Sequence, residues 1–304
     1  MIEPELICVA LAALIATAGG AAAHDMTNVI LTERAANCAG YVAQHTASVT
    51  DIQAGTTYGA VVDITSNGAT CTIASNAVPN HDFNATGSFV VPLSEQNQNY
   101  TVTATPVATG SPTPLSLRMD NAVFLNGVKL DLLAAGCFGV GRGRIGCNDM
   151  ATPYRYDPMS PSSNFGADEH NAHTQPDGTY HYHGNPMALF QQTNADVPSA
   201  VIGFAADGFP IFGSFIEDGG IIRAATTSYR LKSGTRPGGP GGAYDGTFID
   251  DWEYVAGLGD LDACNGMMQD GVYGYVVTAT YPHVLGCFSG TPDSSFLKQP
   301  PGRG

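Results

Sequence analysis

The stretch AHTQPDGTYHYHG, residues 172–184, predicts a β-hairpin. Its Pro-Asp-Gly centre, residues 176–178, is typical of a type I turn followed by a glycine in the left-handed region, which closes a three-residue hairpin loop. This loop fixes the pairing of the two strands and places His173 opposite His181. The hairpin is therefore expected to bring separate histidines together.

The same hairpin separates its histidines from its tyrosines. Side chains alternate between the two faces of a strand, and opposed residues have Cβ atoms about 5 Å apart. His173, His181 and His183 are thus expected on one face, with Tyr180 and Tyr182 on the other. A slip of one residue in the pairing would turn His181 and His183 to the tyrosine face.

Three converging imidazoles predict a divalent metal site. Neutral histidine nitrogens are good ligands for zinc and copper, and three protein ligands with an open fourth position are typical of catalytic zinc. We therefore expect His173, His181 and His183 to hold zinc or copper. The alternative is a polar hairpin face whose histidines only hydrogen-bond to their neighbours.

The remaining chain reads as strands separated by glycine, proline and Asn-Gly turns. The pairs Asn67-Gly68 and Asn126-Gly127 predict two more hairpins, and an Asp-Gly turn divides the apolar residues 199–215. Further strands are expected at 87–93, 100–108 and 274–282, and a short helical turn at 186–192. We expect an all-β fold, an antiparallel sandwich or barrel-like single domain with long loops and disulfides.

Residues 1–23 resemble a secretory signal peptide. An apolar core at residues 6–16 precedes small residues that would permit cleavage before His24, although Glu3 and Glu5 stand where lysine or arginine is usual. The core is too short to span a bilayer, and no later segment is longer. The expected mature domain is 24–304, secreted or periplasmic, with no membrane span.

Cysteine usage agrees with export. Six cysteines remain after the leader, without any C-x-x-C pair, and an even set in an exported chain favours three disulfides. Fifteen pairings are open. We expect pairing between neighbours in sequence: Cys38 with Cys71, Cys137 with Cys147, and Cys264 with Cys287.

The charge balance excludes some partners. Asp and Glu number 27 against 12 Lys and Arg, which gives a formal net charge of −15. Such acidity argues against nucleic acid and anionic membrane surfaces. A small-molecule or polymeric substrate stays open, and its identity and the oligomeric state do not follow from the sequence.

The hairpin and several other stretches closely resemble the YHYH-domain proteins, named for the tetrad at residues 180–183. The resemblance covers about residues 60–290 and implies one continuous, exported domain. It also implies that His81 and Asp207 lie near the tetrad. The stretches that carry it are 172–184, 202–213, 73–83, 121–131, 254–266 and 281–288.

Two carboxylates are candidates for catalysis beside the histidines. Asp207, in an Asp-Gly turn, is expected to orient a metal-bound imidazole or act as a base, although aspartate at such a corner also bonds its own backbone. Glu169 begins the hairpin strand and is the other candidate base. His81 is the candidate for an additional metal ligand, against an ordinary loop histidine.

Arg142 and Arg144 are candidates for substrate binding. They lie in the loop that the Cys137–Cys147 pair would close, where bidentate hydrogen bonds to an anionic group are expected. The alternative is a stapled, solvated loop. Tyr180 and Tyr182 are also expected to contact substrate.

Cleavage after Ala23 would leave His24 as the N-terminal residue. Its amine and imidazole would then chelate copper together, provided that a second histidine lies nearby.

The leading hypothesis for the whole chain is an exported metal-dependent enzyme, hydrolytic with zinc and oxidative with copper. A non-enzymatic metal- or ligand-binding module, or purely structural histidines, are the alternatives.

Overall fold

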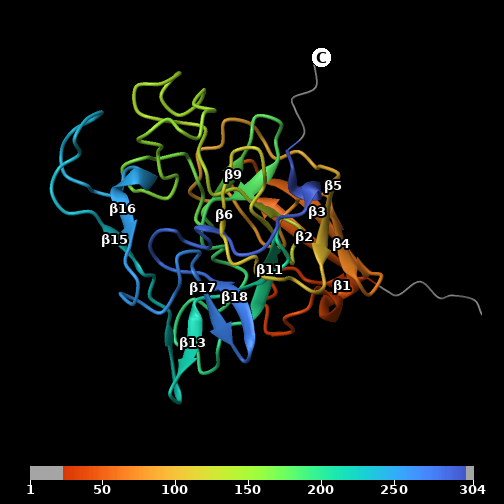
Figure 1. Cartoon of the computed structure of the whole chain (residues 1–304). Helices are drawn as coiled ribbons and strands as arrows, with labels where there is room; N and C mark the ends of the chain where they lie inside the picture. Colours follow the sequence, from red (N-terminus) through yellow and green to blue (C-terminus); the bar gives the residue numbers. More distant parts are fainter. Residues whose placement is uncertain (1–22, 299–304) are drawn as a thin grey trace, which may run out of the picture.

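The computed structural model describes residues 23–298. The signal peptide expected at residues 1–23 lies outside this range, apart from its last position. Within residues 23–298, no helix is both long and apolar enough to cross a membrane. The described chain is all-β, as expected, with strands joined by long loops and three short 3-10 helices (Figure 1).

The first sheet is built from the N-terminal third of the chain. The Asn67-Gly68 turn forms as expected, with Gly68 at a φ of +90°. Alternate residues of the long central strand are buried, including Val62 and Ile64, so one face of this sheet packs inward. The strands run in the order β1 (His24–Asp25), β2 (Ala43–Asp51), β3 (Thr56–Ser66), β4 (Thr70–Ser75) and β5 (Gln98–Thr103).

The second sheet carries the histidine hairpin at its edge. Its order is β17 (Gly266–Gln269), β18 (Val272–Val276), β12 (Pro210–Phe212), β11 (Val201–Ala205), β7 (Ala122–Phe124), β8 (Lys129–Leu130), β10 (Tyr180–Tyr182) and β9 (Ala172–Thr174). Neither sheet closes into a barrel in the described chain. Most strand pairs are antiparallel, as expected, whereas β1 with β2, β8 with β10 and β12 with β18 pair in parallel.

Smaller elements border the two sheets. They are the strand pairs β13 (Phe215–Asp218) with β14 (Ile221–Ala224), β15 (Tyr229–Leu231) with β16 (Trp252–Tyr254), and β6 (Thr113–Pro114) with β19 (Cys287–Phe288). The 3-10 helices are η1 (Cys38–Tyr41), η2 (Ile249–Asp251) and η3 (Ser294–Phe296).

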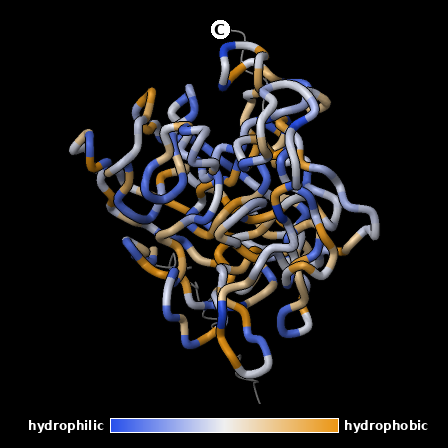
Figure 2. The backbone as a smooth tube through the Cα atoms, turned by 90° about the vertical axis from the view of Figure 1, so that its left-hand side faces the viewer, coloured by the Kyte–Doolittle hydropathy of each residue, from blue (hydrophilic) through white to orange (hydrophobic). Residues whose placement is uncertain are grey.

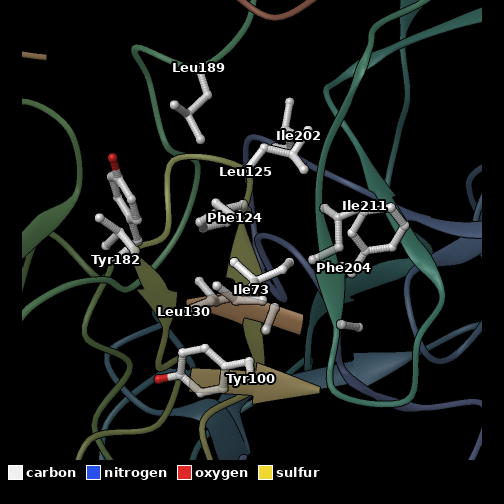
Figure 3. Close-up of a cluster of buried hydrophobic side chains, with 14 of the residues drawn as sticks. Ile73, Tyr100, Phe124, Leu125, Leu130, Tyr182, Leu189, Ile202, Phe204 and Ile211 are labelled. Carbon is white, nitrogen blue, oxygen red and sulfur yellow. The ribbon is translucent and has the colours of Figure 1, made fainter. Parts of the chain in front are cut away.

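One hydrophobic cluster includes residues from both sheets. Ile73 of the first sheet and Phe124, Leu130 and Phe204 of the second belong to it, and each is at most 1% exposed. Figure 3 shows these side chains together with Tyr182, and Figure 2 shows hydrophobic stretches crossing the middle of the molecule. Burial of these groups holds the hairpin sheet against the first sheet.

The three disulfides pair as expected. Cys38 bonds to Cys71, Cys137 to Cys147, and Cys264 to Cys287. The first ties η1 to β4, and the third ties the segment before β17 to β19. Each therefore fixes a loop to a sheet strand or closes a surface loop.

Two expected elements do not form. Residues 87–93 are irregular because their backbone groups do not bond to another strand's backbone: the Ser88 N–H donates to the Gly166 carbonyl in a loop, and the Val91 carbonyl accepts from the Thr174 side chain of β9. Residues 186–192 form turns and no helix, since the Leu189 carbonyl accepts from the Leu31 N–H instead of continuing a helical ladder.

Candidate metal centre

The histidine hairpin has the register that its turn predicts. His181 pairs with His173, and the Gly178 N–H donates to the Gln175 carbonyl at 2.8 Å. Gly178 has a φ of +83°, and a Cβ there would lie 2.6 Å from the Ser94 Cβ, so only glycine fits both the turn and the packing. The local sequence therefore fixes the placement of the histidines.

The three imidazoles converge through their Nε2 atoms. His183 Nε2 lies 3.0 Å from His181 Nε2 and 3.1 Å from His173 Nε2. The three potential ligand atoms all lie within 4.8 Å of one another, and no other such group of three occurs in residues 23–298. Tetrahedral ligands on a metal at about 2 Å are about 3.3 Å apart, so the observed spacing is close to that of a metal site.

Hydrogen bonds at the other ring nitrogens decide which tautomers are present. His173 Nδ1 lies 2.6 Å from the Phe165 carbonyl, and His181 Nδ1 lies 3.3 Å from the Thr179 carbonyl. A carbonyl only accepts, so both Nδ1 atoms carry the proton and both Nε2 atoms present lone pairs. His183 Nδ1 is buried without a hydrogen-bond partner.

The facing lone pairs can be satisfied by a hydrogen bond from His183 or by a cation. Neutral His183 has one proton, so its Nε2 can at best donate to the two facing lone pairs while its buried Nδ1 stays unpaired. A bound cation would instead accept all three Nε2 lone pairs and leave each Nδ1 free to carry a proton. The donor set thus fits a transition metal of the zinc or copper type.

Burial keeps these rings neutral. His181 and His183 are 2% and 5% exposed, and His173 is partly exposed. Burial, followed by the neighbouring histidines, lowers the pKa of His181 and His183 well below the usual range, and burial also lowers the pKa of His173. Because a metal binds the neutral ring, no proton has to be displaced near neutral pH.

A buried charged network lies beside the triad, and it was not among the residues expected from the sequence. Strand β8 pairs in parallel with β10, so Lys129 stands next to His181 and Asp131 follows next to His183. Lys129 Nζ donates to Asp120 Oδ1 at 3.1 Å and to Gln175 Oε1 at 3.2 Å. Lysine and aspartate at alternate positions of an otherwise apolar strand are the sequence signal that could have revealed it.

Asp131 is the carboxylate that acts electrostatically on the triad. Its charge favours the protonated form of His173 and so opposes the effect of burial on the pKa of that ring. Oδ2 accepts from Gln175 Nε2 at 3.2 Å and from Lys298 Nζ, whereas Oδ1 is buried without a partner. An unpartnered buried carboxylate oxygen marks a position where a further donor or a cation would be stabilised.

His81 does not belong to the metal ligands. It lies beside the tetrad, but on the tyrosine side, with Nδ1 2.7 Å from the Asp82 carbonyl and Nε2 2.6 Å from Tyr182 Oη. Both ring nitrogens are therefore engaged. The expectation that His81 is a ligand is not supported, because alternation along β10 places Tyr182 and His183 on opposite faces.

Tyr180 and Tyr182 are core residues with no exposed surface, so they are not placed to contact a substrate. Tyr180 donates its hydroxyl to Asp168 Oδ2 at 2.9 Å, and Tyr182 packs edge-on against Phe124 (Figure 3). Their role in the structure is to anchor the hairpin from behind.

The two expected catalytic carboxylates are engaged elsewhere. Asp207 Oδ2 accepts from Tyr275 Oη at 2.6 Å and from the Gly290 N–H at 2.9 Å, which ties its turn to the C-terminal segment. Glu169 accepts from the Ala85 and Thr86 N–H groups. Neither hydrogen-bonds to the triad, so both read as structural residues.

Of the two loop arginines, only Arg144 is connected to the three histidines. Arg142 and Arg144 are both exposed on the loop closed by Cys137 and Cys147. The Arg144 guanidinium lies over the Phe165 ring, 5.4 Å from its centre, and the Phe165 carbonyl holds His173. Arg144 is therefore connected to the rim of the centre through one residue, whereas Arg142 makes no side-chain hydrogen bond or ion pair in the described chain.

Comparison with known proteins gives a family match that includes the whole hairpin. The family described as YHYH protein matches residues 99–290, well over half of the 304 residues. The chain belongs to the YHYH family. No curated protein and no solved structure matches it. The match begins after His81 and after β4, so the family domain carries the triad, Lys129 and Asp131, and the first four strands precede it.

Proposed function

We propose that this YHYH protein is an exported metalloprotein in which His173, His181 and His183 hold zinc or copper. The convergence of three Nε2 atoms carries the proposal. His183 Nε2 lies 3.0 Å and 3.1 Å from the other two, and at least two of the three atoms present a lone pair. The three disulfides support an oxidising compartment, extracellular or periplasmic.

The ligand set favours an enzyme. Three histidines without a fourth His, Cys, Asp or Glu ligand in the described residues leave one position of a tetrahedral metal open. The partial exposure of His173 gives this centre a solvent-facing side. Such a metal supplies Lewis acidity and water activation if it is zinc, and oxidative chemistry if it is copper.

Asp131 replaces Asp207 and Glu169 as the carboxylate assigned to the proposed site. Its unpartnered Oδ1 would accept a proton or orient a donor, while Gln175 and Lys298 hold Oδ2. Lys298 offsets its charge, whereas Lys129 pairs with Asp120. The network would therefore position one carboxylate oxygen beside the metal.

The test is metal content in the complete chain, exported so that its disulfides form. Elemental analysis would compare the natural sequence with His181→Gln and His183→Gln, and with His170→Gln as the matched control. His170 packs against His81, with ring centres 4.0 Å apart and planes tilted by 46°, on the tyrosine side of the hairpin.

We expect both hairpin variants to hold one equivalent less zinc or copper than the natural sequence and the His170 variant. The metal found selects hydrolytic or oxidative assays. Equal metal content in all four proteins, after incubation with zinc and with copper, would show that the triad is held by imidazole hydrogen bonds alone.

A further inference from the structure

A pair of histidines separate from the triad lies in the first sheet, before the family domain. Strand β1 pairs in parallel with β2, and His24 stands in register with His45. Residues in register on neighbouring strands project to the same face. The two ring centres are 5.8 Å apart with the planes at 45°.

This spacing permits both rings to bind one metal. A metal about 2 Å from a ring nitrogen lies about 3.1 Å from the ring centre, so two rings on one metal have centres at most about 6.3 Å apart. The observed 5.8 Å corresponds to a wide N–metal–N angle of about 140°. This angle lies between the tetrahedral value of about 109° and the trans value of about 180°, so the choice of metal rests on the nitrogen donors and not on this spacing.

The residues that follow β1 hold His24 in place. The Met26 N–H donates to the Thr46 carbonyl at 2.8 Å, and Asn80 Nδ2 donates to the Met26 carbonyl at 3.1 Å. Asp25 Oδ1 accepts from both the N–H and the hydroxyl of Thr27. These bonds fix the short strand to β2 and to the loop that follows β4.

The two histidines also border a hollow. A pocket of about 310 Å³ includes both of them and is otherwise mostly apolar, with Ile30, Tyr41 and Leu125 in its lining. His45 is half-buried. His24 is exposed.

We propose that His24 and His45 form a second metal site, specific for copper, in which the α-amine of His24 is the third ligand after removal of the leader. Cleavage directly before His24, as expected from the sequence, would leave a free α-amine on the residue that also carries the imidazole. An amine and an imidazole on one residue chelate a single ion, and His45 adds the third nitrogen. All three are nitrogen donors, for which Cu(II) has the highest affinity of the divalent first-row ions.

The test uses the full-length chain carried through an exporting host, with His181→Gln and His183→Gln introduced so that the triad does not bind copper. Mass spectrometry of the purified protein would identify the N-terminal residue. Titration with Cu(II), followed by calorimetry and by electron paramagnetic resonance, would report affinity and the number of nitrogen ligands.

Three further changes separate the ligands: His45→Gln, a five-residue Gly-Ser extension before His24, and Gln44→Ala as the control. Gln44 is the exposed neighbour of His45 on the other face of β2. We expect one equivalent of Cu(II) on three nitrogens, weakened more than about tenfold by His45→Gln and by the extension and unchanged by Gln44→Ala.

The proposal would be overturned by an N-terminus other than His24, or by copper binding that is insensitive to His45→Gln or to the extension. Thermal unfolding of each variant distinguishes loss of the ligand from loss of the fold. The result is independent of the triad, because two of its three histidines are already replaced and His173 alone does not make that site.

Discussion

Tyr182 donates its phenolic proton to Nε2 of His81 across 2.6 Å, directly behind the strand that presents His181 and His183. The Asn126 amide donates to the same phenolic oxygen at 3.1 Å. His81 Nδ1 donates in turn to the Asp82 carbonyl. Burial keeps His81 neutral. The chain of hydrogen bonds fixes the back of the hairpin that carries the three converging histidines.

His81 should make stability fall at acid pH. Burial, with a smaller effect from the charge of His170, lowers its pKa to about 3, whereas an unfolded histidine has a pKa near 6.5. Between these values the unfolded chain binds a proton that His81 in the folded protein does not bind. The stabilising effect of neutral His81 is therefore complete above pH 6.5, and it is lost as pH falls toward 3, by up to about 1.4 kcal/mol per pH unit.

Urea unfolding at pH 7, 6, 5 and 4 would measure this effect. His81→Asn is expected to be less stable at pH 7. Its free energy of unfolding should fall less steeply with decreasing pH, because up to one fewer proton is taken up on unfolding. Glu169, His170 and the two hairpin tyrosines face His81 and remain in the variant, so the comparison isolates His81. Parallel stability curves would contradict the assignment.

Asp131→Asn should weaken metal binding without unfolding the protein. The amide keeps the shape of the side chain, but the negative charge that acts on His173 and pairs with Lys298 is lost. We expect affinity to fall about tenfold, the lower end of the range for groups outside the ligand set. Competition with a chelator would measure it, and Asp207→Asn, which should leave affinity unchanged, is the control.

Asp207→Ala should reduce stability while metal content is kept. The change leaves the Tyr275 hydroxyl and the Gly290 N–H without their buried acceptor. Losing such an acceptor costs about 1–3 kcal/mol. Urea unfolding and elemental analysis on the same sample would check both parts, and a loss of metal at unchanged stability would restore Asp207 as a functional residue.

Replacing Cys38 and Cys71 together by alanine should lower the unfolding free energy by about 3–4 kcal/mol, because the bond closes a loop with a sequence separation of 33. Denaturation under non-reducing conditions would measure the difference. A loss below about 1 kcal/mol would indicate that the buried contacts of η1 hold this loop without the bond.

The sequence by itself determined the features that local chemistry fixes. The Pro-Asp-Gly turn set the register of β9 and β10, and alternation then placed His173, His181 and His183 on one face. A turn and its first hydrogen bonds involve residues a few positions apart, so their outcome can be predicted without the rest of the fold. The disulfide pairing between neighbouring cysteines was also predicted.

Tertiary structure decided what surrounds those histidines. Asp131 reaches the triad because β8 pairs in parallel with β10, about fifty residues further along the chain. Asp207 was drawn instead to Tyr275 and Gly290, and His81 to Tyr182. Residues 87–93 do not form the expected strand, because they bond to the loop at Gly166 and to the Thr174 side chain of β9. Such long-range pairings depend on how the two sheets bury their apolar faces together, and no local pattern encodes that choice.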